Sequence, residues 1–472
     1  MPMLEPQNAS NDRPMFAIVG GGISGVVQAI YLAEKYPSLN IVIFEKNEDF
    51  LTGTSAINPG RPSLGFHYQD LPTATFCQDN TVNFTKFLER IKCPTIFADA
   101  PQMGIYVLMK DSLSILGETI RPIFRPDELE GCFEKIRHHA IDKYSNDEDF
   151  KRHFGHPEAI CRKLDKVEYE PLLTQETLKG VGACYETSEK TFNIPGICSY
   201  LREYVKKFKN IKVLTGAIVT HIEKPCGPKD KDYRITWGSN VDDRTQVSTA
   251  QFLTLACWER VGHFLKQLNR ENSQPTHNRL KMLGIIEIDM EKARPETIRP
   301  IFVASGAFSM ISPQVRHQLR DGRLVCDCAC TLAIRTNVMA SADDVPLPAD
   351  YVRKIEGNMS LEERLDLAKP ILEGAKGIFA CMKDARLVDA RFGTVRVPFG
   401  SGKNINIHAA ASEHHSRADH GFKALGDRLF INEAMKVIYA VHNAELAAEC
   451  IQSDVTKMIG NLKGVNGGTN GI

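Results

Sequence analysis

The sequence lacks a net charge, and it lacks long apolar runs. Its 472 residues include 58 Lys and Arg and 58 Asp and Glu, so that the formal net charge is +0. A balanced chain has no general field that attracts nucleic acid or an anionic membrane surface. No apolar run approaches the roughly eighteen residues that cross a bilayer. We therefore expect no nucleic-acid partner and no transmembrane segment.

The chain also lacks a recognisable export signal. Residues 1–13 are polar, without the apolar core of a signal peptide. Thirteen cysteines without such a signal indicate reduced thiols and a cytoplasmic location. We expect residues 1–13, and the glycine- and asparagine-rich residues 461–472, to be flexible tails.

Motifs for several other chemistries are missing. There is no G-x-S-x-G elbow of a serine hydrolase, and the G-S-G-K at residues 400–403 lacks the first glycine of a phosphate-binding loop. Metal sites favour C-x₂-C pairs, whereas the cysteines here alternate on a predicted strand and the histidines share a polar loop. These residues are Cys326, Cys328, Cys330, His414, His415 and His420. We therefore expect no metal, with packed cysteines and a solvated or lid-like histidine loop.

A glycine-rich turn follows the first apolar segment. Residues 15–20, MFAIVG, are apolar and β-branched, which is typical of a buried parallel strand. Gly20, Gly22 and Gly25 then form G-x-G-x-x-G. The first glycine permits a tight turn, the second lets a phosphate approach the backbone, and the third lets helix and strand pack closely.

A helix and an acidic residue complete this unit. The helix predicted from Ile23 would present free N–H groups, including that of Ser24, to a pyrophosphate. The strand NIVIFEK follows, and Glu45 lies twenty residues after Gly25, where a carboxylate can accept the hydroxyls of an adenosine ribose. Strand, turn, helix and acid in this order predict a dinucleotide site.

A long loop after the second strand favours FAD over NAD. The segment DFLTGTSAINPGRPSLGFHYQDLPTATF is rich in Gly, Pro, Ser and Thr, where an NAD-type domain would continue with further strands and helices. With its GGGISG, EK, TS…N and G-x-x-x-x-G-x-x-Y motifs, the sequence resembles the FAD-dependent oxidoreductases of the D-amino-acid oxidase superfamily. Weaker similarity continues along most of the chain.

The resemblance implies an α/β fold, in which a Rossmann-like FAD-binding domain of the glutathione-reductase type is joined to a mainly antiparallel β substrate domain. We expect a discontinuous FAD-binding domain over residues 14–110, 185–265 and 385–460. The substrate domain would take residues 111–184 and 266–384. Repeated period-2 alternation within residues 284–336 supports that second sheet.

The same resemblance implies a set of FAD contacts. They are Gly20, Gly22, Ile23, Ser24, Gly25, Glu45, Lys46, Thr54, Ser55, Val219, Ala256, Trp258, Lys436 and Val437. In the family, the start of the last helix stabilises negative charge on the flavin, and Lys436 would do so here. The sequence departs from the family's glycines near Cys257 and Ala434.

Candidate catalytic residues lie in the loop that the family places near the flavin. Arg61 could bind a carboxylate, His67 could accept a substrate proton, and Tyr68 could contribute a phenol. His67 could instead only brace the loop or the cofactor. Arg335 and Arg396 are alternative carboxylate ligands, or structural arginines. We expect this loop to cover the flavin because it is too polar for a core.

The function expected is oxidation of a small amino acid, amine or 2-hydroxy acid by hydride transfer to FAD, with O₂ or a quinone as electron acceptor. Two alternatives stay open. One is a flavin amine oxidase or monooxygenase of another class. The other is an FAD-binding protein that has lost catalysis and serves in interactions.

Overall fold

Strand β1 (Met15–Val19) lies inside a six-stranded sheet of order β19-β20-β12-β1-β2-β8. Its partners β2 and β12 run parallel to it, β8 and β20 extend the parallel pairing, and only the edge strand β19 is antiparallel. Four of the five β1 residues are buried, as expected for a sheet that is covered on both faces. The other strands are β2 (Asn40–Phe44), β8 (Ile211–Leu214), β12 (Phe252–Leu255), β19 (Phe422–Ala424) and β20 (Leu429–Asn432).

This computed structural model describes residues 13–98, 103–224, 232–239, 242–271, 276–304, 308–332, 337–342, 347–398 and 421–466. Arg335, the histidine loop and the G-S-G-K segment therefore lie outside the described residues. Within the described chain, no helix has the length and hydrophobicity needed to cross a membrane.

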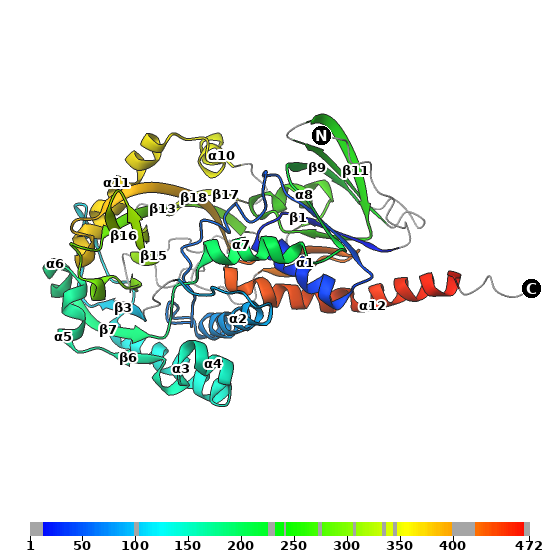
Figure 1. Cartoon of the computed structure of the whole chain (residues 1–472). Coiled ribbons are helices and arrows are strands. Elements are labelled where there is room, and N and C mark those ends of the chain that lie inside the picture. The colour runs from blue at the N-terminus through cyan, green and yellow to red at the C-terminus, as the bar shows by residue number, and fades with distance from the viewer. Residues whose placement is uncertain are drawn as a thin grey trace, which may run out of the picture.

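Helices cover the six-stranded sheet. Helix α1 (Ile23–Lys35) packs against α12 (Ala440–Asn466) and α7 (Ile194–Val205), and these three helices run close together (Figure 1). Helix α2 (Leu71–Arg90) packs against α12 and begins at Asp70, whose carboxylate accepts the backbone N–H of Thr73. Helices α1 and α2 from the N-terminal part of the chain and α12 from its C-terminal part thus pack together in one layer.

A three-stranded antiparallel sheet joins this layer. It contains β9 (Ala217–Glu223), β10 (Tyr233–Ser239) and β11 (Asp242–Ala250). The short helices η3 (Trp258–Arg260) and α8 (Val261–Gln267) follow β12. Val219, Ile222 and Ile235 of this sheet share a core with β1, β12 and α8.

The remaining strands form a nine-stranded sheet, except β4 and β5, which pair with each other. Its order is β17-β13-β16-β15-β14-β3-β7-β6, with β18 paired to β13, and all pairs are antiparallel except β3 with β14. The strands are β3 (Gly104–Met109), β6 (Cys161–Lys163), β7 (Val181–Thr187), β13 (Thr276–Asp289), β14 (Ile301–Val303), β15 (Met310–Arg320), β16 (Arg323–Thr331), β17 (Asn337–Ala342) and β18 (Arg386–Pro398). Helix α11 (Leu361–Ile378) packs on β13, β16 and β18.

Further elements complete the fold. They are β4 (Leu113–Ile115), β5 (Glu118–Ile120), α3 (Pro126–Tyr144), α4 (Glu148–Phe154), η1 (Pro157–Ala159), α5 (Lys166–Tyr169), η2 (Glu170–Leu172), α6 (Gln175–Lys179), η4 (Pro295–Thr297), α10 (Ala349–Ile355), η5 (Ala380–Met382) and η7 (Val437–Tyr439).

The α/β class with a parallel sheet and a mainly antiparallel second sheet is confirmed. The division into two discontinuous domains stays a prediction. Strands β3 and β18 lie within segments assigned to the FAD-binding domain, yet both pair in the nine-stranded sheet.

The three alternating cysteines of β16 pack into the core beneath the nine-stranded sheet. Cys326, Cys328 and Cys330 are buried, and none of the three forms a disulfide bond. Burial raises the pKa of the Cys328 thiol well above its ordinary value. The described residues contain no group of His, Cys, Asp or Glu side chains arranged to hold a metal ion.

Candidate functional site

The glycine turn after β1 is packed against backbone. Gly20 has φ +116°, and a Cβ there would overlap the carbonyl oxygen of Ala256. A Cβ on Gly25 would overlap the carbonyl oxygen of Gly20. Both glycines are therefore required by close approach of the main chain and, at Gly20, also by the positive φ.

Two serines bring distant segments to the start of α1. The N–H of Ile23 donates to Ser55 Oγ at 2.9 Å. The N–H of Ala434 donates to Ser24 Oγ at 3.2 Å. The loop after β2 and the segment before η7 thus meet at the N-terminus of α1, whose dipole favours negative charge.

Glu45 lies at the carboxyl end of β2. Its Oε2 accepts the N–H of Gly21 at 2.8 Å, and its Oε1 accepts the N–H of Asn47 at 2.9 Å. The residue is 8% exposed, and burial raises the pKa of the carboxyl group although both N–H donors oppose the shift. Each oxygen keeps lone-pair capacity for a further donor.

A cavity of 240 Å³, the glycine cavity, opens along this turn. Predicted FAD contacts that line it are Gly20, Gly22, Ile23, Ser24, Glu45, Lys46, Thr54, Ser55, Val219, Ala256, Trp258 and Val437. Gly25 lies behind the wall, where it permits helix and strand to pack, and Lys436 lines the neighbouring cavity. All the predicted FAD contacts except Gly25 therefore line one of two adjoining cavities, although they come from segments far apart in the chain.

Two residues of the glycine cavity are held by partners in other segments. The indole N–H of Trp258 donates to the carbonyl oxygen of Thr394 in β18 at 2.5 Å. The ammonium group of Lys46 lies 3.7 Å from Glu259 and 3.9 Å from Glu356. Glu356 follows α10, so a segment from the nine-stranded side reaches the end of the cavity that contains Glu45.

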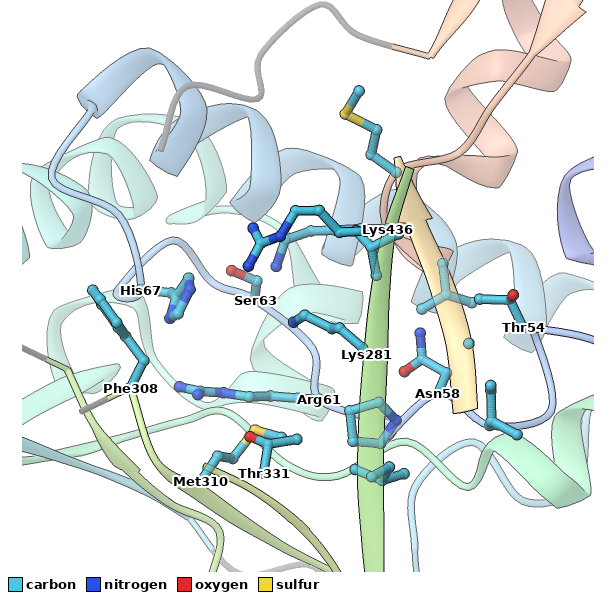
Figure 2. Close-up of a pocket in the computed structure, with 18 of the residues that line it drawn as sticks. Thr54, Asn58, Arg61, Ser63, His67, Lys281, Phe308, Met310, Thr331 and Lys436 are labelled. Carbon is cyan, nitrogen blue, oxygen red and sulfur yellow. The ribbon is translucent and has the colours of Figure 1, made fainter. Parts of the chain in front are cut away.

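A second cavity of 260 Å³, the cationic cavity, adjoins the first. Both are lined by Thr54, Asn58, Val395, Met435 and Val437. The second contains all three predicted catalytic residues, Arg61, His67 and Tyr68, together with Lys436. Figure 2 shows Arg61, His67 and Lys436 around this cavity. The structure therefore brings the loop and the segment before α12 into one site.

Arg61 is strongly held within the cationic cavity. Its guanidinium lies 4.2 Å from the Phe302 ring centre and 4.7 Å from that of Tyr106. It also lies 3.5 Å from Glu189, whose other contacts include the Tyr106 hydroxyl at 2.7 Å. This partner offsets the charge of Arg61.

His67 stands among aromatic rings. Its ring centre lies 4.5 Å from that of Phe302 and 4.8 Å from that of Tyr68. The expectation that the loop is too polar for a core is wrong, because Leu64, Phe66 and Tyr68 are buried in the main apolar cluster. The alternate residues Leu64, Phe66 and Tyr68 anchor the loop in this cluster. Arg61 and His67 of the same loop line the cationic cavity.

Three further cations were not singled out from the sequence. Arg279 and Lys281 of β13 and Arg391 of β18 line the cationic cavity. The register pairs Lys281 with Gly393, and side chains two apart on a strand share a face. The alternation of polar and apolar residues in NRLKML, residues 278–283, was the available signal in the sequence. It showed neither which face of the strand points inward nor which residues face that side.

Arg396 could bind a substrate carboxylate or serve as a structural arginine, and its surroundings fit the structural role. It is fully buried, its Nε lies 2.5 Å from Glu433, and its other nitrogens donate to Asn278 at 3.0 Å and Thr276 at 2.5 Å. Its even position in β18 points it away from Gly393 and Val395. It does not line the cationic cavity.

Comparison with known proteins identifies the family. The sequence model of the DAO family, described as FAD dependent oxidoreductase, matches residues 15–258. The chain belongs to this family. The predicted family, the FAD cofactor and the assignment as an FAD-dependent oxidoreductase are therefore confirmed. No curated protein matches the sequence significantly.

Solved structures agree with the fold of this oxidoreductase. An L-amino acid deaminase from Proteus vulgaris is 14% identical with a TM-score of 0.60, over 96% of both chains. A glycine oxidase from Geobacillus kaustophilus is 14% identical with a TM-score of 0.56, over 94% of this chain and 95% of that one. An FAD-bound L-α-glycerophosphate oxidase from Mycoplasma pneumoniae is 14% identical with a TM-score of 0.56, over 93% and 94%.

Proposed function

We propose that this oxidoreductase binds FAD along the glycine cavity and oxidises a small amino acid, amine or 2-hydroxy acid in the cationic cavity. The observation that carries the proposal is the junction of the two cavities. Five residues line both, so a long ligand in the first can present its reactive end to a small molecule in the second. When bound, FAD supplies a hydride acceptor.

The glycine cavity fits FAD in three respects. Backbone packed around Gly20 and Gly25 keeps side chains away from a pyrophosphate. The Glu45 carboxylate stands at the end of β2, where it can accept ribose hydroxyls. The start of α1 offers a positive dipole end between these two points.

The cationic cavity supports roles for the chain's own residues. Arg61 and its cationic neighbours would hold a substrate carboxylate. His67 would take the hydroxyl or amine proton as the substrate C–H bond breaks. Tyr68 and Phe302 hold the His67 ring in place. Lys436, at the junction side of the cavity, would stabilise negative charge on the cofactor.

Anaerobic titration tests this proposal. The purified holoprotein should be yellow and release a compound with the spectrum and mass of FAD. A panel of amino acids, amines and 2-hydroxy acids is then added without oxygen, and flavin absorbance is followed. Bleaching by a member of the panel supports the proposed reaction. If flavin is bound but no member bleaches it, the function is wrong. Reoxidation of the bleached enzyme by O₂ or by a soluble quinone identifies the acceptor.

A further inference from the structure

Four buried polar side chains form a chain of hydrogen bonds through the core, which we call the core polar network. They are Gln28 of α1, Thr254 of β12, Asn432 at the end of β20 and Asn443 of α12, and each is at most 2% exposed. The same four elements contribute to the main apolar cluster. Polar groups buried in such surroundings are costly unless their hydrogen-bond partners are present. The four side chains therefore depend on one another's positions.

The hydrogen bonds of the network run in one direction. Asn443 Nδ2 donates to Asn432 Oδ1 at 2.9 Å, and Asn432 Nδ2 donates to Gln28 Oε1 at 2.8 Å. Gln28 Nε2 then donates to Thr254 Oγ1 at 3.0 Å. Asn432 and Gln28 each donate one of these bonds and accept another, so neither amide can turn without breaking two. In the low dielectric of the core, successive bonds of this kind strengthen one another.

The network reaches the glycine cavity through Asn432. Its Nδ2 also donates to the carbonyl oxygen of Ser24 at 3.3 Å. Two residues further on, the N–H of Ala434 donates to Ser24 Oγ at 3.2 Å. Ser24 lies in the first turn of α1 and lines the glycine cavity. The chain that leaves β20 is thus held against the start of α1 by both a side chain and the backbone.

The residue between these two contacts is fixed as well. The N–H of Glu433 donates to the carbonyl oxygen of Gly421 at 2.5 Å, and its carboxylate lies 2.5 Å from Nε of Arg396 in β18. Three successive residues, 432 to 434, are therefore anchored. Met435 and Val437 follow at once and line both cavities, and Lys436 between them lines the cationic cavity. Movement of Asn432 would consequently be passed on to the junction of the cavities.

We propose that the core polar network is a positioning device, which sets the place of residues 434–437, and with them Lys436, relative to the start of α1. The inference rests on the proposed function, which puts the reactive end of FAD at the junction. It goes further by giving a role in the flavin's electrostatic environment to Gln28, Thr254, Asn432 and Asn443. None of these four described residues lines either cavity.

A structural role and a positioning role predict different results. Loss of a buried hydrogen bond destabilises the protein in either case. The stabilisation of a negatively charged reduced flavin depends on the distance to the Lys436 ammonium group. Only the positioning role therefore predicts that breaking the network changes the reduction potential of flavin that is still bound.

Asn432→Leu is the main variant, because it replaces the central amide by an apolar side chain of similar shape. The reduction potential of the FAD-loaded enzyme should become more negative, by less than in Lys436→Met, since the cation is displaced and not removed. Release of FAD from the holoenzyme, followed by flavin fluorescence, should be about two- to tenfold faster, which is the range for loss of one hydrogen bond.

Thr254→Val is the milder variant and tests the network if Asn432→Leu does not fold. It removes only the hydroxyl that accepts the Gln28 bond, and both measurements should change in the same directions by less. The matched control is Thr177→Val. The Thr177 hydroxyl in α6 is equally buried and donates to the carbonyl oxygen of Gly377 at 3.2 Å, and Thr177 lines neither cavity.

The control should lower the melting temperature as Thr254→Val does, but keep the wild-type potential and rate of FAD release. Wild-type potentials in the network variants would overturn the inference, whatever their melting temperatures. An equal shift in Thr177→Val would also overturn it, because the effect would not be specific to the network.

Lys436→Met separates this inference from the proposed function. If Lys436→Met shifts the potential and the network variants do not, the inference alone is wrong. If Lys436→Met leaves the potential unchanged, the flavin end does not lie at the junction, and the proposed arrangement of the site fails together with the inference. A shift in Lys436→Met, a smaller one in the network variants and none in Thr177→Val would support both.

Discussion

The ammonium group of Lys436 lies 5.0 Å from the centre of the Tyr68 ring. Lys436 precedes α12, whereas Tyr68 ends the loop that follows β2, so this cation–π contact joins the two segments that border the cationic cavity. The cation is consequently held near the junction with the glycine cavity. This junction is where the proposed function puts the reactive end of FAD.

Lys436→Met should make the flavin's reduction potential more negative. Loss of the positive neighbour would leave negative charge on the reduced cofactor less stabilised. A redox titration of the holoenzyme against a reference dye measures the shift. Lys369→Met, which changes a 68%-exposed lysine of α11 that does not line the cationic cavity, serves as the control. An unchanged potential in a folded, FAD-loaded variant would remove Lys436 from the flavin site.

Glu45→Ala should weaken FAD binding by about 1.5–3 kcal/mol, the range for a hydrogen bond to a charged group. The matched control is Glu48→Ala, which changes an exposed carboxylate three residues away. FAD titration of the apoprotein measures both affinities. Comparable affinity in the two variants would contradict a ribose contact at Glu45. Thermal melting of the apoproteins separates the loss of the Gly21 and Asn47 hydrogen bonds from the loss of the ligand contact.

His67→Ala should slow anaerobic flavin reduction by about 10²–10⁴-fold and leave FAD bound, if the imidazole accepts the substrate proton. Phe302→Leu is a useful comparison, because it alters the ring packed on His67 without removing the base. The rate is measured by stopped flow and normalised to FAD content. A variant that loses flavin or stability but keeps its rate per bound flavin would make His67 a bracing residue.

Loss of one member of the buried Arg396–Glu433 pair should destabilise the protein by about 3–5 kcal/mol, since the remaining charge would be buried. We expect this for Arg396→Met and for Glu433→Met, while the double variant should recover much of the loss. Urea unfolding of the three variants measures the coupling. If the two single losses simply add, the pair is not coupled.

Stability should fall in acid through Glu287. Burial raises the pKa of its carboxyl group, but hydrogen bonds from Arg386 and Arg320 outweigh that effect and hold the pKa below its ordinary value. A carboxylate whose pKa is lowered in the folded state stabilises that state fully at pH values above the pKa of the unfolded state, which is about 4.3. That stabilisation is lost as the pH falls through the lower folded value. Urea unfolding of wild type and Glu287→Gln from pH 7 to pH 3 should show a difference that shrinks in acid. A difference independent of pH would exclude this carboxylate as the source.

The glycine cavity could be predicted from the sequence because its determinants are local. A turn that excludes Cβ atoms, a helix start and an acid at the end of the next strand follow each other within residues 15–46. The order of elements along one short segment fixes their relative positions, since a βαβ unit has one favoured hand. Val219, Trp258 and Val437 required the family resemblance, and no feature of their own segments indicated them.

The cationic cavity was decided by tertiary structure. Arg279 and Lys281 alternate visibly in the sequence, but only the pairing of β13 with β18 places them on the face toward Arg61 and His67. A shift of one residue in that register would turn them to the other face. Arg396 shows the same dependence, because its position in β18 sends it to Glu433 and not into the cavity. The residue types were fixed by the chain, whereas the side on which each charge lies depends on long-range strand pairing.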